Sequence, residues 1–262
     1  MWRYLRLFAY FVRFSFSRAM EFRLDFFFRV VMDCLFYVVQ FVFFFIIYRH
    51  TDAVGGWNLD QIIVFTAGYL WLDAVNMTLF SNNMWWLPML INKGDLDYYL
   101  VRPVSSLFFV SLRDFAANSF MNLVIAGAIL GWALLRHPGE IPLENYVAYA
   151  VLMALGSYFF YLVQIWFATP TFWLHSAQGL REIQFRLTQY AERPDQIFRP
   201  WLRRILLTVL PLALTVSVPT HVLFNGLTWP VALNVGGAAV FGTVFTIWFW
   251  NRGLRGYVSA SS

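Results

Sequence analysis

The chain has 262 residues and a net charge of +5; 60% of the residues are apolar and only 13% are charged. A soluble domain has about twice that share of charged residues, so these charges are too few to cover a water-exposed surface. The composition therefore predicts a polytopic membrane protein, and the single cysteine excludes both a disulfide framework within the chain and a cysteine metal cluster.

The first element, residues 1–25, is a basic helix that is too charged to span a membrane. At 100° per residue its polar positions share one face, namely Arg3, Arg6, Tyr10, Arg13, Ser17 and Glu21. The opposite face is apolar and consists of Leu5, Phe8, Val12, Phe16 and Ala19. This pattern predicts an amphipathic helix in the inner membrane interface. It acts either as an anchor or residual topogenic signal, or as a mechanical link to a cytoplasmic partner.

The rest of the chain, residues 26–262, is predicted to form one all-α domain with six transmembrane helices. A helix needs about 20 apolar residues to cross a hydrocarbon core about 30 Å thick. Six stretches qualify: 26–48, 61–80, 114–135, 145–169, 205–224 and 229–250. The fifth is the weakest because Pro211 and Pro219 interrupt it. The short gap after it, at Asn225-Gly226, predicts a hairpin of the last two elements that can include a re-entrant piece around 218–224.

Two polar residues lie one turn apart in the second span, Asp73 and Asn76. A carboxylate inside a membrane is costly and marks a functional site by default. The structural alternative is that Asp73 pairs with another helix and only holds the bundle together. The two residues are therefore assigned either to a transport path or to an interhelical contact.

Other polar residues of the spans have simpler interpretations. Asp33 follows Arg29 by four residues, which predicts an i,i+4 ion pair near the inner interface. Gln40 and Gln164 are predicted to form interhelical hydrogen bonds. The spans show no series of carboxylates, although a proton-driven carrier is expected to have one.

The loop INKGDLDYYLVRP, residues 91–103, gathers charges between two apolar stretches. Gly94 is expected to end the second helix in a left-handed cap. Asp95 is expected to cap a new short helix, and Asp97 suits the positive end of its dipole. Pro103 disfavours helical geometry at Arg102, so the helix ends there.

The same loop is amphipathic over its predicted two turns. Leu96, Tyr99 and Leu100 share one helix face at i, i+3 and i+4. The result is a short rigid helix across the cytoplasmic mouth of the bundle, apolar on one side and charged on the other. It is either a contact for a soluble partner or an ordinary capped loop.

Lysine and arginine residues orient the predicted bundle. With the N-terminus in the cytoplasm, 17 of the 19 fall in inner segments, and only Arg49 and Arg136 fall in outer loops. The inner segments include residues 170–204, which are helical in character up to Pro194 and are then broken by two Arg-Pro pairs. This asymmetry predicts that both termini are cytoplasmic.

Several catalytic motifs are missing from the sequence. The lysine of a phosphate-binding loop follows a glycine, whereas the only lysine here, Lys93, follows Asn92, so ATP binding of that kind is excluded. No Gly-x-Ser-x-Gly, His-Glu-x-x-His or Cys-x-x-Cys pattern occurs, and the four histidines are far apart. The chain is therefore expected to be no enzyme, and to bind no metal and no cofactor.

Two segments carry a resemblance to a known family. GDLDYYLVRP resembles the Gly-x-Leu-Asp-x-x-Leu-x-Arg-Pro signature in the first cytoplasmic loop of one subgroup of ABC type 2 transporter permeases. The matching positions are Gly94, Leu96, Asp97, Leu100, Arg102 and Pro103. MEFRLDFF is similar to the Glu-x-Arg-x-(Asp/Asn) start of that subgroup's first span, at Glu21, Arg23 and Asp25.

The resemblance implies the transmembrane subunit of an ATP-driven exporter in the cell inner (plasma) membrane. ATP and Mg would be bound by a separate ATPase, and the permease would pair with a second copy or a sister permease. The N-terminal helix, with Arg3, Arg6, Arg13, Glu21 and Arg23, would be the connecting helix. The loop from Gly94 to Pro103, including Asp95, would be the coupling helix. Besides membrane lipid and these proteins no partner is implied, and nucleic acid is not expected.

Two other classes of function stay open at this point. A secondary carrier or channel needs no ATPase, and ATP-independent transport by the purified chain would identify it. A membrane-embedded enzyme acting on lipid is the second class, and the sequence offers no catalytic constellation for it. The sequence does not name a substrate.

Overall fold

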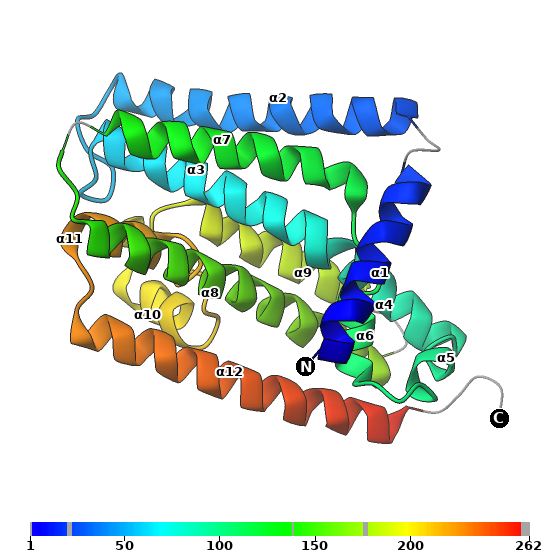
Figure 1. The fold of residues 1–262 in the computed structure, drawn as a ribbon. Coiled ribbons are helices and arrows are strands. Elements are labelled where there is room, and N and C mark those ends of the chain that lie inside the picture. Colours follow the sequence, from blue (N-terminus) through cyan, green and yellow to red (C-terminus); the bar gives the residue numbers. More distant parts are fainter. Residues whose placement is uncertain (1, 20–22, 138, 175–177, 258–262) are drawn as a thin grey trace.

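The computed structural model describes residues 2–19, 23–137, 139–174 and 178–257. Within these ranges the secondary structure is helical, apart from one isolated bridge between Val54 and Trp57. The helices form an elongated bundle with two distinct ends (Figure 1). The all-α prediction is confirmed.

The helices follow the chain in order. The first half has α1 (Trp2–Ala19), α2 (Arg23–Tyr48), α3 (Leu59–Asn76), a π-helical turn η1 (Met77–Ser81), α4 (Asn82–Lys93), α5 (Asp97–Leu100), α6 (Ser106–Leu112), η2 (Ala117–Ser119) and α7 (Phe120–Arg136). The second half has α8 (Leu143–Ala168), η3 (Thr169–Phe172), α9 (Gln178–Thr188), η4 (Gln189–Glu192), η5 (Asp195–Ile197), α10 (Pro200–Thr208), α11 (Ser217–Asn225) and α12 (Trp229–Gly256).

Among the described residues, four helical stretches are long and apolar enough to cross a membrane. They are Val30–Tyr48, Leu59–Lys93, Leu143–Phe172 and Trp229–Gly256, and the shorter α7 is also apolar. These correspond to predicted spans one, two, four and six, with α7 at the third. The structure thus supports a multi-pass membrane protein.

The two ends of the bundle hold different elements (Figure 1). The end that holds α1, α5, α6 and the end of α12 is called the α5 end. The opposite end holds α11 and residues 49–58 and is called the α11 end. Predicted outer loops lie at the α11 end, and the predicted coupling loop lies at the α5 end.

The core is centred on α3, which packs against α2, α7, α8 and α11. Its residues 62–70 are all buried. The turn before α11 approaches α8 so closely at Gly156 that an added Cβ there would lie 2.1 Å from the Thr215 carbonyl oxygen. Glycine is therefore required at this contact, which fixes α11 on α8.

The fifth predicted span is wrong as a continuous helix. Residues 205–224 include the end of α10, a series of turns over 209–216, and most of α11. Pro211 lies in these turns, and proline cannot continue a helix because it lacks the N–H donor. Pro219 is tolerated in the first turn of α11, where such donors are unpaired in any case.

The prediction that residues 193–204 lie on the same side of the membrane as the other basic segments is also wrong. Ile197 contacts Gly55, which belongs to the loop at the α11 end. The chain has therefore crossed the bundle between α8 and η5, and α9 with η4 makes this crossing (Figure 1). Four arginines that the sequence assigned to the α5 end lie beyond the crossing: Arg193, Arg199, Arg203 and Arg204.

Helix α1 lies across the α5 end and packs on α6 and η2 through aromatic rings. Tyr4 contacts Phe108 at a centroid distance of 4.7 Å, and Phe11 contacts Phe109 at 5.1 Å. Leu5 of the predicted apolar face is 56% exposed in the single chain, as a side chain that faces lipid would be. Arg3, Arg6 and Arg13 point to the exposed side as predicted, whereas Glu21 lies outside the described residues, as does the side chain of Arg23.

Candidate functional site

The loop at the α5 end begins as the sequence predicts. Gly94 closes α4 with φ 78° and ψ 2°, the left-handed geometry that favours glycine. Leu96 follows and is fully buried in the cluster that contains Leu87 and Ile91. The loop is therefore anchored in the bundle by one apolar side chain.

The helix that follows is shorter than predicted. Helix α5 is a single turn, and its N-cap residue is Leu96, without a side-chain capping bond, so the capping role expected of Asp95 is wrong. Leu96 takes this position because its N–H donates to the Leu90 carbonyl at 3.3 Å, which draws it into the core. Asp97 is the acidic residue of the first turn, as predicted.

Contacts with α6 and α12 hold α5 in place. Arg113 Nη1 donates to the Tyr99 hydroxyl, and the guanidinium lies 4.9 Å from the Tyr99 ring centroid. At the end of α12, burial and the nearby carboxylates of Asp97 and Asp95 raise the pKa of the Tyr257 phenol to about 12. The loop therefore contacts α4, α6 and the end of α12 at once.

The outward side of α5 carries residues that the sequence did not single out. Tyr98 is 71% exposed and Val101 is 82% exposed, whereas Leu100 is only partly exposed. Arg102 and Pro103 are exposed beside them. Tyr98 and Val101 are three residues apart and so share one helix face, and this spacing was the signal available in the sequence. Together these four residues, here called the loop tip, form a surface suited to contact with a protein.

Asn76 is part of an interhelical link. It is buried, and its Oδ1 accepts hydrogen bonds from Gln164 Nε2 at 2.5 Å and from Ser81 Oγ at 3.0 Å. The first of these bonds joins α3 to α8. The structural assignment of Asn76 therefore fits the geometry, and so does the prediction for Gln164.

Asp73 lies close to two other carboxylates. It is within electrostatic range of Asp33 on α2 and Glu192 on η4. Glu192 accepts from Tyr69 Oη at 3.2 Å and from Gln40 Nε2 at 3.4 Å. The bundle thus gathers acidic residues from three elements, which the sequence did not predict because Glu192 was assigned to an inner segment.

Asp33 has a different partner from the one expected. Asn122 Nδ2 of α7 donates to its carboxylate, whereas the side chain of Arg29 lies outside the described residues. Carboxylates can bind metal ions, yet the described part of the chain contains no group of three or more His, Cys, Asp or Glu residues that could hold one. Asp33 and Glu192 accept hydrogen bonds from neighbouring side chains instead.

Helix α9 has a polar face that is open in the single chain. Glu182 Oε1 and Arg186 Nη2 form an ion pair at 2.9 Å, with side chains 59% and 73% exposed. At about 1.5 Å per residue, α9 and η4 extend over roughly 22 Å. They begin beside α4, where the Arg181 guanidinium lies 4.9 Å from the Trp85 ring centroid, and end beside Tyr69 of α3.

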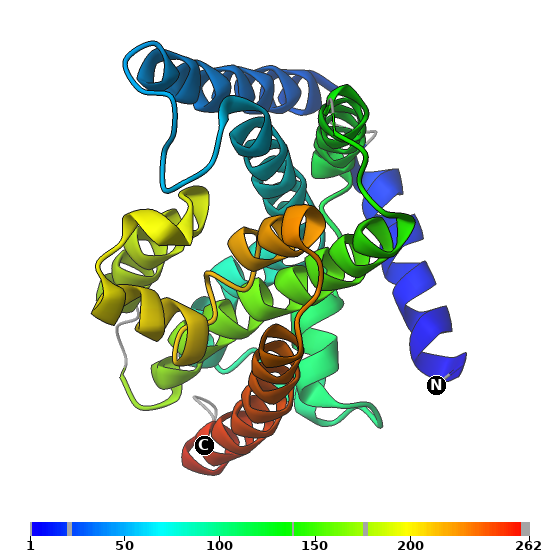
Figure 2. The same ribbon diagram turned by 90° about the vertical axis from the view of Figure 1, so that its left-hand side faces the viewer.

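Figure 2 shows α9 and α10 on the outer side of the bundle, away from α1. Exposed charged side chains on a helix that crosses a membrane bundle are expensive in lipid, so Glu182 and Arg186 are expected to face a water-filled cavity or another protein. The sequence did not identify α9 as a crossing element because it is not apolar.

Comparison with known protein families gives a match over most of the chain. A family model described as "ABC-2 family transporter protein" matches residues 34–261. Neither a curated protein nor a solved structure matches the chain. The matched region includes the loop at the α5 end, the acidic residue Asp73 and the polar face of α9.

Proposed function

The chain belongs to the ABC-2 transporter family, and we propose that it is the permease of an ATP-driven exporter, paired with a second permease and coupled to separate ATPase subunits. Membership makes it a membrane permease component of an ABC transporter, a family that associates with ABC ATPase subunits and is generally not enzymatic. Direction of transport, pairing and coupling are the proposed parts.

The observation that carries the proposal is the exposed polar face of α9. Two permeases that face each other through α9 would enclose Glu182 and Arg186 between them, away from lipid. Water and a polar portion of the substrate would then pass along these residues. In contrast, the large exposed side chains along the middle of α12 are apolar, as in a lipid-facing helix: Leu233, Val240, Phe241, Val244, Ile247 and Trp248.

The loop tip supports coupling to a partner ATPase. Movement of that partner against Tyr98 and Val101 would be passed on through Leu96 to α4, and through the contact with Tyr257 to α12. ATP and Mg would be bound by the ATPase. Helix α1 lies at the same end and would offer its exposed arginines to the same partner.

Cysteine cross-linking tests the pairing. Cys34 is first replaced by serine, because it is the chain's only cysteine. Single Glu182→Cys and Gln189→Cys variants should then form cross-linked permease pairs in membranes, whereas Val240→Cys and Val244→Cys on α12 should not. If the α12 positions cross-link and the α9 positions do not, the path along α9 is wrong. Co-purification with an ATPase subunit, in the same preparation, tests the coupling.

A second candidate function rests on the acidic residues at mid-bundle. Asp33, Asp73 and Glu192 lie on different elements, as the residues of an ion-coupled carrier often do. Substrate movement driven by an ion gradient in liposomes that contain the purified chain alone, and lost in Asp73→Asn, would favour the carrier over the ABC exporter.

A further inference from the structure

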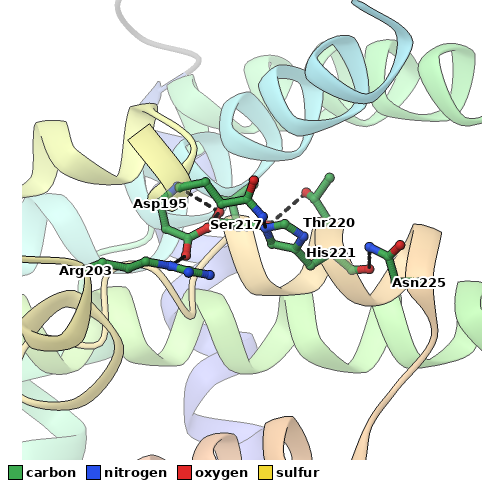
Figure 3. A network of polar contacts seen from close by, with 8 residues as sticks. Asp195, Arg203, Ser217, Thr220, His221 and Asn225 are labelled. Atoms are coloured by element: carbon green, nitrogen blue, oxygen red, sulfur yellow. Dashed lines mark hydrogen bonds and ion pairs between the residues drawn. The ribbon is translucent and has the colours of Figure 1, made fainter. Parts of the chain in front are cut away.

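A polar network lies at the α11 end, where η5, α10 and α11 meet (Figure 3). Asp195 is 1% exposed and is held by three side chains. Arg203 Nε donates to Oδ2 at 2.5 Å and Ser217 Oγ donates to Oδ1 at 2.5 Å, while His221 Nε2 lies 3.4 Å from Oδ1. Because a buried carboxylate requires such partners, the network fixes the position of the Arg203 side chain.

The network is braced by its surroundings. The His221 ring lies 4.6 Å from the ring of Trp57, a buried residue of the loop between α2 and α3. Ser217 Oγ also accepts from the Asp195 backbone N–H at 3.1 Å. Arg203 is therefore presented by a rigid support, although its own side chain is partly exposed.

A cavity of about 310 Å³ adjoins this network between α10, α11 and α12. Its lining combines four polar side chains, Gln196, Arg203, His221 and Asn234, with five apolar ones, Leu207, Leu214, Val218, Pro230 and Val231. The volume is at the lower end of the range for small-molecule sites. A lining that combines polar and apolar side chains suits a molecule with a polar group and a hydrocarbon chain.

The positive charge of Arg203 in the cavity lining favours an anion. Asp195 engages only Nε of Arg203, and the two Nη nitrogens make no hydrogen bond to the described residues. Exposed Arg199 and Arg204 flank the segment, while the nearby acids Asp195 and Glu192 already accept hydrogen bonds. The planar fork of a guanidinium matches the oxygens of a phosphate, which it binds in a bidentate manner.

The depth of the cavity indicates where that phosphate comes from. Trp201 of α10 and Trp229 of α12 are exposed near the cavity, and tryptophan is enriched at the level of lipid headgroups. Val209, which follows α10, and Leu233 of α12 are also exposed, as in surfaces that face acyl chains. A phosphate that reaches this cavity is therefore most simply carried by a membrane lipid.

We propose that the cavity binds the headgroup of an anionic phospholipid, with Arg203 donating to the phosphate and an acyl chain lying along Leu207 and Val231. Asn234 and Gln196 would donate to the remaining headgroup oxygens. The bound lipid would join α10 and α11 to α12. This site does not depend on the direction of transport or on the pairing of permeases.

Lipid retention tests the proposal. The purified permease, with any ATPase that co-purifies, is delipidated and incubated with phosphatidylglycerol or with diacylglycerol of the same acyl chains. Bound lipid is counted by native mass spectrometry. Phosphatidylglycerol should be retained about tenfold or more over diacylglycerol, because only the former offers a charged acceptor to Arg203.

Matched variants identify the cavity. Arg203→Gln should lower phosphatidylglycerol retention about tenfold or more, whereas Arg204→Gln, an exposed neighbour, should not. Since Arg203→Gln also removes a partner of Asp195, Val231→Trp provides a second variant that fills the cavity and leaves the ion pair intact. Val240→Trp, on the exposed face of the same helix, is its control.

Three results would overturn the proposal. The first is phosphatidylglycerol retention by Val231→Trp that equals the wild type. The second is equal retention of diacylglycerol and phosphatidylglycerol by the wild type. The third is displacement of bound lipid by an equal concentration of glycerol phosphate, because the site would then recognise a soluble phosphate without an acyl chain.

Discussion

Replacing Gly94 by alanine should impair the loop at the α5 end without unfolding the bundle. Gly94 has φ 78°, and a residue with a Cβ costs about 1–2 kcal/mol in the left-handed region. That free energy corresponds to a change of roughly 5- to 30-fold in the population of the native cap. The variant would spend more time with Leu96 displaced from its buried position, and the loop tip would move with it.

The assay is ATP hydrolysis by the reconstituted permease–ATPase complex, with recovery of the complex measured in the same preparation. Gly131→Ala is the matched control, because Gly131 is helical and an added Cβ there meets nothing within 4 Å. The free energy of unfolding of this control variant should be unchanged or higher by about 0.5–1 kcal/mol. We expect Gly94→Ala to change the complex's hydrolysis rate or recovery and Gly131→Ala to change neither. Wild-type behaviour of Gly94→Ala in both readouts would refute the coupling role of residues 94–103.

Four further outcomes are expected. The purified chain alone should not hydrolyse ATP, since it has no Gly-Lys pair, and turnover by a homogeneous sample would contradict this. In a cysteine-free background, Asp52→Cys and Arg199→Cys should label from the same side of the membrane, and Lys93→Cys from the other; labelling of Arg199→Cys together with Lys93→Cys would refute the crossing by α9. Gln164→Leu should destabilise the protein by about 1 kcal/mol, and the double variant with Asn76→Leu should lose less stability than the sum of the two single variants. Strictly additive losses in thermal unfolding would argue against the hydrogen bond between the two side chains. Burial tends to raise the pKa of Asp195, but hydrogen bonds from His221, Ser217 and Arg203 lower it to about 2. The native state should therefore lose roughly 2 kcal/mol of stability as the pH falls from about 4 to 2, and Asp195→Asn should abolish this part of the pH dependence of the melting temperature.

The features that the sequence predicted correctly depend on local patterns. Long apolar stretches mark α2, α8 and α12 because a helix in lipid must be apolar along its length. Gly94 was identified because a glycine after an apolar helix commonly closes it in left-handed geometry. Neither inference requires knowledge of which elements pack together.

The features that the sequence missed depend on tertiary contacts. Helix α9 has the composition of a surface helix, and only its packing beside α3, α4 and α8 shows that it crosses the bundle. Aspartate is a common N-cap residue, but the buried Leu96 occupies the N-cap position of α5, so Asp95 lies one residue too early to cap this helix. The acidic residues at mid-bundle are remote in sequence and are brought together only by the crossing of α9.

The crossing of α9 also changes how the basic residues are distributed between the two ends of the bundle. Lysine and arginine near the ends of spans orient a bundle because they are retained on the cytoplasmic side. Arg193, Arg199, Arg203 and Arg204 lie beyond the crossing, so they weaken the bias toward the α5 end without reversing it. Four arginines on the disfavoured side need another explanation. For Arg203, the explanation is its ion pair with the buried carboxylate of Asp195 together with its position in the lining of the cavity. An anionic headgroup is therefore the simplest partner for the α11 end.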